Sequence, residues 1–205
     1  MSFYENHILP CLTHVVCSAK NFEQKRAIIV PDAQGDVLEI GMGSGLNLPY
    51  YQQNNIRKII GLEPSAALRK RAEKTAANLD IDLSLIHNGA EDIPLGKNSI
   101  DTVLITFAMC TIPEIETALE EIRRVLKKNG DLLFCEHGLA PDTSVQRWQH
   151  RLNPLWKKLA GGCNLNRNIP ELIQQAGFKI NSIENQYMRG PKALSYIYRG
   201  SAGIR

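Results

Sequence analysis

The sequence lacks the features that mark several large classes of protein. Its longest apolar run, Val103–Ile112, is about half of the roughly 20 residues that a membrane-spanning helix needs. Met1–Glu5 contain no basic residue, so no secretory signal is expected. The five cysteines are scattered and form no C-x-x-C pair, which predicts a reduced, cytoplasmic setting. A net charge of +3 without a clustered basic stripe argues against a nucleic-acid partner.

What the chain does contain is a regular alternation of strand-like and helix-like segments. Its 205 residues, 43% of them hydrophobic, suit a single domain over 1–205. From Asp36 onward the alternation predicts an α/β fold with mostly parallel strands joined by helices. The expected strands are Val37–Ile40, Lys58–Leu62, Asp82–Ile86, Thr102–Thr106, Asp131–Glu136, Phe178–Ile183 and Ala193–Tyr198.

Three helices stand out between these strands. Ser65 is expected to cap the first, which runs to about Ala77. The second has an apolar stripe; it is expected to carry Pro113 in its first turn and to stop at Asn129-Gly130. The third covers Ile169–Ala176. Residues 1–30 are expected to form one or two helices that act as a lid, and 138–168 an insertion over the active edge of the sheet.

The sharpest local signal is the glycine loop Glu39-Ile40-Gly41-Met42-Gly43-Ser44-Gly45, which follows the first strand. Glycines permit a tight turn and a close approach to a ligand. The loop lacks the G-K-[ST] of a phosphate-binding loop, and Leu46 stands where a dinucleotide-binding motif has its third glycine. A nicotinamide-dependent oxidoreductase is therefore the weaker alternative.

An acidic residue accompanies the loop. Glu63 ends the second strand and can accept hydrogen bonds from the two hydroxyls of a ribose. Farther along, Gly89-Ala90-Glu91-Asp92-Ile93-Pro94 precedes the fourth strand.

In this order, the motifs resemble those of class I methyltransferases that depend on S-adenosylmethionine (SAM), of the methyltransferase type 11 group. The resemblance covers about residues 36–137 and implies a Rossmann-like fold with a seven-stranded sheet covered by helices on both faces. It implies SAM as cofactor and S-adenosylhomocysteine (SAH) as product. Family members usually carry an acidic residue where Gly89 stands, so the Ala90 amide or Glu91 is expected to serve instead. The cofactor-binding residues that the resemblance implies are Glu39, Gly41, Met42, Gly43, Gly45, Asn47, Glu63, Pro64, Ser65, Gly89, Ala90, Glu91, Thr106 and Phe107.

Residues 36–178 also resemble a narrower group, the methyltransferase-like-seven proteins, which are membrane-associated alkyl thiol methyltransferases of animals, and their bacterial relatives of unassigned substrate. The resemblance rests on Met109-Cys110-Thr111, Glu136-His137, Trp148, Trp156 and Gly162–Arg167. It implies direct in-line methyl transfer to a small acceptor, with a thiol as one candidate. A lipid head-group amine or a quinone-type acceptor stays open. The hydrophobic anchor of the animal proteins is not expected here.

His137 is the candidate catalytic residue, as a base or to orient the acceptor, because its ordinary pKa suits proton transfer at neutral pH. The alternative is a histidine that only holds the insertion. Trp148 and Trp156 are candidates for the wall of an apolar pocket or for the core. The candidate substrate-binding residues are Tyr4, His14, Cys110, Cys163, Asn164 and Arg167.

No metal site is expected. His7, Cys11, His14 and Cys17 would share one helix face, but a single helix cannot easily surround a tetrahedral ion with four of its own side chains. The apolar face of this segment is also compatible with peripheral contact to a membrane. A non-catalytic SAM-binding protein is the alternative from another functional class.

Overall fold

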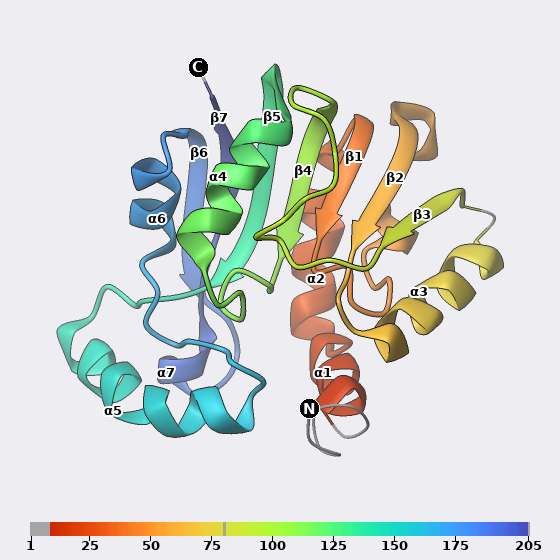
Figure 1. The fold of residues 1–205 in the computed structure, drawn as a ribbon. Coiled ribbons are helices and arrows are strands. Elements are labelled where there is room, and N and C mark those ends of the chain that lie inside the picture. The colour runs from red at the N-terminus through yellow and green to blue at the C-terminus, as the bar shows by residue number, and fades with distance from the viewer. Residues whose placement is uncertain (1–8, 80, 205) are drawn as a thin grey trace.

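A single twisted sheet organises the computed structural model, which describes residues 9–79 and 81–204 (Figure 1). The strand order is β3-β2-β1-β4-β5-β7-β6, and β7 runs antiparallel to both of its neighbours. The predicted α/β fold with a mostly parallel seven-stranded sheet is therefore confirmed. The strands are β1 (Gly35–Ile40), β2 (Ile56–Leu62), β3 (Leu83–Ile86), β4 (Ile100–Thr106), β5 (Leu126–His137), β6 (Lys179–Tyr187) and β7 (Tyr196–Gly203).

Helices cover both faces of this sheet because its central strands are apolar on both sides. Along β1, Leu38 and Ile40 enter one core, whereas Val37 enters the other. The first core is closed by α4 (Ile115–Val125) and α6 (Ile169–Gln175), and the second by α2 (Lys20–Ile29) and α3 (Ala66–Asn78). Figure 1 shows α4 and α6 in front of the sheet and α2 behind it.

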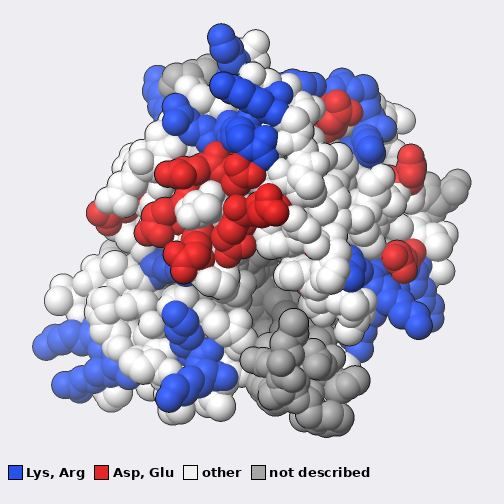
Figure 2. Space-filling model, viewed as in Figure 1, with Lys and Arg blue, Asp and Glu red and all other residues white. Residues whose placement is uncertain are grey.

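The helix α4 differs from its prediction at both ends. Pro113 lies two residues before the helix, which begins at Ile115. The helix ends at Val125 and does not continue to Asn129-Gly130, which lie inside β5. The reason is sheet pairing, since the buried Leu126 already pairs with Ile100 of β4. Glu116 lies in the first turn of α4, and Arg123 and Arg124 lie in its last turn, an order that suits the helix dipole. Figure 2 shows an acidic patch on this face of the molecule with basic side chains above it.

The end of the chain also departs in detail from prediction. Ala193 was expected to begin the last strand, but it lies in the short helix α7 (Lys192–Ser195). The strand β7 therefore begins at Tyr196 and extends to Gly203. The other helices follow their predicted places: Ser65 caps α3 through its hydroxyl, and Gly177 follows α6 with a φ of 82°.

Several segments gather where the parallel strands end. These are α1 (Leu9–Cys17), α5 (Thr143–Leu159) and α7, which lie together at the bottom of Figure 1. The strand order reverses between β1 and β4, and ligands of open α/β sheets bind at such a switch point. Short 3-10 turns complete the connections at Val30–Asp32, Leu48–Tyr50 and Gln53–Asn55. Within the described ranges, none of the helices has both the length and the apolarity to cross a bilayer.

Candidate functional site

The glycine loop turns sharply at the end of β1, at the switch point. Gly41, Gly43 and Gly45 have φ values of 65°, 60° and 79°, which side chains with a Cβ rarely adopt. A Cβ on Gly41 would come within 2.6 Å of the Ala108 Cβ, so Gly41 lets the two loops meet. A Cβ on Gly43 would meet nothing closer than the Gly41 carbonyl oxygen at 3.8 Å. Gly43 therefore leaves its backbone open to the cavity beside it.

Glu63 ties this loop to the end of β2. Its side chain is only 6% exposed, and its carboxylate accepts hydrogen bonds from the backbone N–H of Gly43 at 2.9 Å and of Ser65 at 2.8 Å. Burial raises the pKa of Glu63, and these two hydrogen bonds oppose the rise. Each carboxylate oxygen has a second lone pair, so the group can still accept hydrogen bonds from a ligand.

A cavity of about 360 Å³ opens above these residues and is called the cofactor cavity below. It extends from the glycine loop to the loop after β3. Most of the predicted cofactor-binding residues at the ends of β1 to β4 form its wall, namely Gly41, Gly43, Glu63, Pro64, Gly89, Ala90, Glu91 and Phe107. Gly89 carries no side chain there, and Glu91 beside it is half-buried.

A smaller hollow of about 60 Å³ continues from the glycine loop toward α1 and α2. The predicted residues Met42, Asn47 and Thr106 line it, together with His14, whose Nδ1 lies 2.7 Å from the Ser44 hydroxyl. A positive charge also lines this hollow, because Arg26 reaches it from α2.

Arg26 is 5% exposed, which is unusual for an arginine. Its Nη1 donates to the Cys17 carbonyl at 2.7 Å, and its guanidinium lies 5.4 Å from the centre of the Phe107 ring. Its Nε is buried and has no hydrogen-bond partner among the described residues. A buried cation with an unused donor, beside a hollow, is suited to hold an anionic group.

Two of the predicted residues lie beneath the loop and not on a cavity wall. Glu39 is buried and accepts hydrogen bonds from Asn47 at 2.9 Å and from the Tyr51 hydroxyl at 2.7 Å. Burial raises the pKa of Glu39 to about 7. Gly45 faces Leu48 and α3, where a Cβ would come within 2.8 Å of the Leu48 side chain. The structure thus places Glu39 and Gly45 as supports for the loop.

A third cavity, of about 320 Å³, lies between the end of β5 and the helices α1 and α5 and is called the apolar cavity below. Phe107 lies between the apolar cavity, the hollow and the cofactor cavity, because it lines all three. Phe107 has a φ of 54°, a conformation that is uncommon outside glycine. The described residues of its wall are uncharged, namely Leu12, Val16, Cys17, Phe22, Phe107, Cys110, Thr111, His137, Trp156, Leu159, Ala160, Cys163, Met188 and Leu194.

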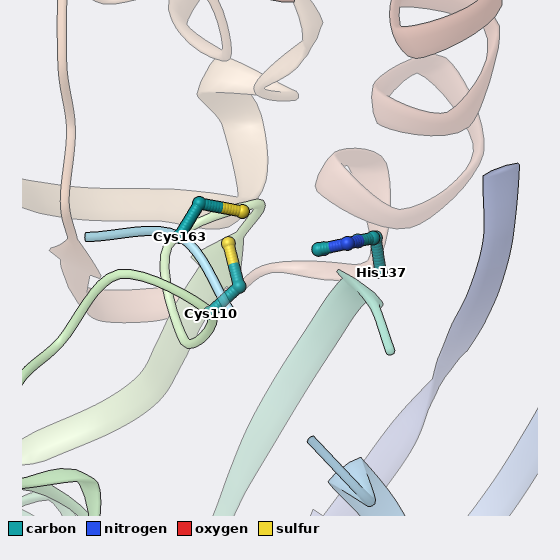
Figure 3. Close-up of side chains that lie close together, drawn as sticks. All are labelled: Cys110, His137 and Cys163. Carbon is teal, nitrogen blue, oxygen red and sulfur yellow. The ribbon is translucent and has the colours of Figure 1, made fainter. Parts of the chain in front are cut away.

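Three of the predicted site residues meet in this wall. The Cys110 and Cys163 sulfurs and a ring nitrogen of His137 all lie within 4.8 Å of one another, and Figure 3 shows the two thiols facing each other with the imidazole pointing toward them. Burial lowers the pKa of His137 to about 4, so its imidazole is neutral at pH 7. A hydrogen bond from Cys110 lowers the pKa of Cys163, and the same bond raises that of Cys110.

Asn164 and Arg167, also predicted to contact substrate, hold the loop that carries Cys110. Asn164 Nδ2 donates to the Cys110 carbonyl at 3.0 Å. Arg167 donates to the carbonyls of Met109 and, at 2.7 Å, of Ile112. Arg167 lines a separate hollow beside α6 and not the apolar cavity. Tyr4 and His7 lie outside the described residues.

The described members of the N-terminal histidine and cysteine set do not converge. His14 contacts Ser44, and Cys11 Sγ lies 3.0 Å from Arg71 Nη2. The two tryptophans also differ. Trp156 lines the apolar cavity, whereas Trp148 is 57% exposed.

Several residues of the site carry no local sequence signal. Arg26 sits in an ordinary amphipathic helix, and Ser44 is a loop residue between two glycines. Met188 and Leu194 reach the apolar cavity from the segment between β6 and β7. Only the folded arrangement brings these residues to the end of the sheet.

Comparison with known proteins gives a consistent set of similarities. Residues 38–134 match the family model of a methyltransferase domain. The chain is 31% identical over 154 residues to thiol S-methyltransferase TMT1B of Rattus norvegicus, covering 73% of this chain and 62% of that protein. The human TMT1B is 28% identical over 180 residues, covering 86% of this chain and 71% of that protein. The chain thus spans less than two thirds of the rat protein's length.

The fold also resembles that of solved methyltransferase structures. A SAM-dependent methyltransferase from Aquifex aeolicus superposes with a TM-score of 0.65 at 16% identity. That superposition covers 96% of this chain and 98% of the other. The likeness shows that the whole described arrangement, and not only the glycine loop, follows this architecture.

Proposed function

We propose that this chain, which carries a methyltransferase domain over residues 38–134, is a SAM-dependent methyltransferase and transfers the methyl group of SAM to the sulfur of a small apolar thiol. The observation that carries the choice of acceptor is the apolar cavity, because none of the described residues in its wall has a charged side chain. A thiol is neutral below its ordinary pKa of about 8.5 and enters such a cavity at little cost. An amine would enter as a cation and lose its hydration without a counter-charge.

SAM occupies the cofactor cavity and the hollow beside it. The ribose hydroxyls bind the free lone pairs of Glu63, and the adenine lies toward Gly89, Ala90 and Glu91. The amino-acid end of SAM enters the hollow, where its carboxylate pairs with Arg26. This placement supplies a reason for the unused Arg26 donor. It leaves the sulfonium beside Phe107, facing the apolar cavity.

The chemistry then needs alignment more than it needs a strong base. The acceptor sulfur forms a bond to the methyl carbon, the bond from the sulfonium to that carbon breaks, and its electron pair stays on the sulfur of SAH. Holding the two sulfurs in line contributes up to about 7–11 kcal/mol in favourable cases. His137 with a pKa of about 4 is a weak base, so its role is to accept the hydrogen bond of the acceptor thiol and orient it.

Two segments complete this arrangement. The helices α1 and α2 act as a lid over the glycine loop, and 138–168 cover the apolar cavity within one domain. Both supply residues to the cavity wall, with Leu12 and Val16 from α1 and Trp156 from α5. Excluding water there strengthens the alignment of the acceptor and protects the sulfonium from side reactions.

A competition among matched acceptors tests this proposal. The protein is supplied with SAM and an equimolar mixture of a linear alkyl thiol, the primary amine of the same chain length and a hydroquinone, and the products are identified by mass spectrometry. Methyl thioether is expected as the dominant product, and Glu63→Ala should abolish it. Methylated amine or quinol in its place would refute the choice of acceptor. No methylated product from any acceptor, with SAM binding intact, would favour a non-catalytic SAM-binding protein.

A further inference from the structure

Cys110, His137 and Cys163 come from three separate segments and meet at one end of the apolar cavity. Cys110 lies in the loop after β4, His137 ends β5, and Cys163 follows α5. Their sulfur and nitrogen atoms lie within 4.8 Å of one another, and Figure 3 shows all three side chains directed toward a common point. This is the only group of three histidine, cysteine or acidic residues within the described ranges whose ligand atoms converge in this way.

The distances are close to those that a metal ion requires. Zinc binds cysteine sulfur at about 2.3 Å and histidine nitrogen at about 2.0–2.1 Å, so ligand atoms of a tetrahedral site lie roughly 3.5–3.8 Å apart. The three atoms need to approach by at most about 1.3 Å to reach that spacing. Cys163 can supply the movement, because Gly161 and Gly162, with φ values of 59° and 88°, precede it.

The donor set selects the class of ion. Two thiolates and one imidazole are soft and borderline ligands, which favour zinc over magnesium or calcium. Two thiolates also balance the charge of a divalent ion, so a buried site carries no net charge.

We propose that Cys110, His137 and Cys163 bind a single zinc ion whose fourth coordination position opens into the apolar cavity. All three residues line that cavity, so a ligand entering it reaches the ion without further rearrangement of the wall. Three protein ligands and one open position are typical of catalytic zinc, whereas structural zinc has four protein ligands.

The open position deepens the proposed function and rests on it. A thiol acceptor that coordinates zinc loses its proton to solvent and becomes a thiolate at neutral pH. This thiolate forms the new bond to the methyl carbon while the sulfonium bond breaks and leaves its electron pair on SAH. The thioether product is a weaker ligand than the thiolate, so it leaves the ion. With zinc bound, the lone pair of His137 coordinates the ion in place of accepting the hydrogen bond of the acceptor thiol, and no protein base is needed.

Metal binding is measured directly on the full chain. The reduced protein is dialysed against zinc and then against metal-free buffer, and bound zinc is counted by mass spectrometry of the metal. One zinc per chain is expected, and competition with a chromophoric chelator gives its affinity. Cys110→Ser and Cys163→Ser should each weaken that affinity by more than about 100-fold, since loss of even an outer partner costs 10–100-fold. Cys11→Ser, an exposed cysteine on α1, is the matched control and should change nothing.

Cobalt substitution reports on the open position. The cobalt protein should show sulfur-to-metal charge-transfer absorption. An alkyl thiol should change that spectrum, whereas the alcohol of the same chain length should not. This readout uses the unmutated chain, so it holds even if a cysteine variant fails to fold. Substoichiometric zinc that is unaffected by Cys110→Ser and Cys163→Ser would overturn the site. A cobalt spectrum that is insensitive to thiol would overturn the open position.

The two proposals fail separately. Calorimetric titration of SAM into Cys110→Ser should match the unmutated chain, because Cys110 lies outside the wall of the cofactor cavity. A chain that binds SAM and methylates thiols but retains no zinc would leave the proposed function standing and refute the metal site. A chain that retains zinc at these residues but methylates no thiol would keep the site and refute the acceptor.

Discussion

Replacing Arg26 with glutamine tests how the amino-acid end of SAM is held. Arg26 is 5% exposed, one of its donors is bound to the Cys17 carbonyl, and its Nε has no partner among the described residues. A carboxylate in the adjoining hollow would therefore gain a charge-assisted hydrogen bond in a site shielded from water. Such bonds contribute about 1.5–3 kcal/mol, so Arg26→Gln should raise the Kd of SAH by about 10- to 150-fold.

The design of the ligand pair separates binding from folding. SAH carries the amino-acid group, whereas 5′-methylthioadenosine keeps the adenosine and the sulfur but lacks the carboxylate. Isothermal titration calorimetry of Arg26→Gln should show weaker SAH binding and unchanged methylthioadenosine binding. Arg26→Lys, which keeps the charge, should recover part of the loss. Equal weakening of both ligands would refute the assignment, because Arg26 would then act through the structure of α1 and α2.

Three further changes test the supports of the site. Gly43→Ala should lower the free energy of unfolding by roughly 1–2 kcal/mol, because Gly43 has a φ of 60°. It should also block SAM binding in calorimetry, because the new Cβ enters the open space of the cofactor cavity. Gly96→Ala, whose Cβ would meet nothing within 4 Å, is the control and should leave SAM binding unchanged. Burial raises the pKa of Glu39 to about 7 from its ordinary value of about 4.5, so its contribution to stability is fully present below pH 4.5 and is lost as pH rises to about 7. Glu39→Gln should therefore reduce the fall in unfolding free energy over that window by on the order of 3 kcal/mol in urea titrations, and identical pH profiles would contradict the assignment. Ser65→Ala should destabilise the protein by about 1 kcal/mol in thermal melts, since its hydroxyl caps α3 by accepting from Leu68 N–H, and an unchanged melting temperature would show that this cap contributes little.

The elements that the sequence predicts well are those with a strong local pattern. The strand Val37–Ile40 and the helix capped by Ser65 appear within two residues of their expected bounds. The glycine spacing and Glu63 also meet as expected, because the second strand lies beside the first in a parallel sheet. Local periodicity and turn chemistry determine these features, so they are visible without tertiary contacts.

Contacts between residues that are distant in the sequence were not predicted, even where the residues themselves were. Asn129-Gly130 has the composition of a helix stop, but pairing with β4 had already drawn the chain into β5 at Leu126. Arg26 looks like an exposed helix residue until the folded chain places it over Phe107. Cys110 and Cys163 are 53 positions apart and share no spacing motif, yet the loop held by Asn164 brings their thiols together.

Titration of the purified chain with SAM, SAH and NADH, with Glu63→Ala as control, tests the central claim most directly. Glu63 holds the glycine loop through two backbone N–H groups and faces the cofactor cavity. The account predicts saturable binding of SAM and SAH in one-to-one stoichiometry, its loss in Glu63→Ala, and no binding of NADH. Absence of SAM and SAH binding, or binding of NADH in their place, would contradict it.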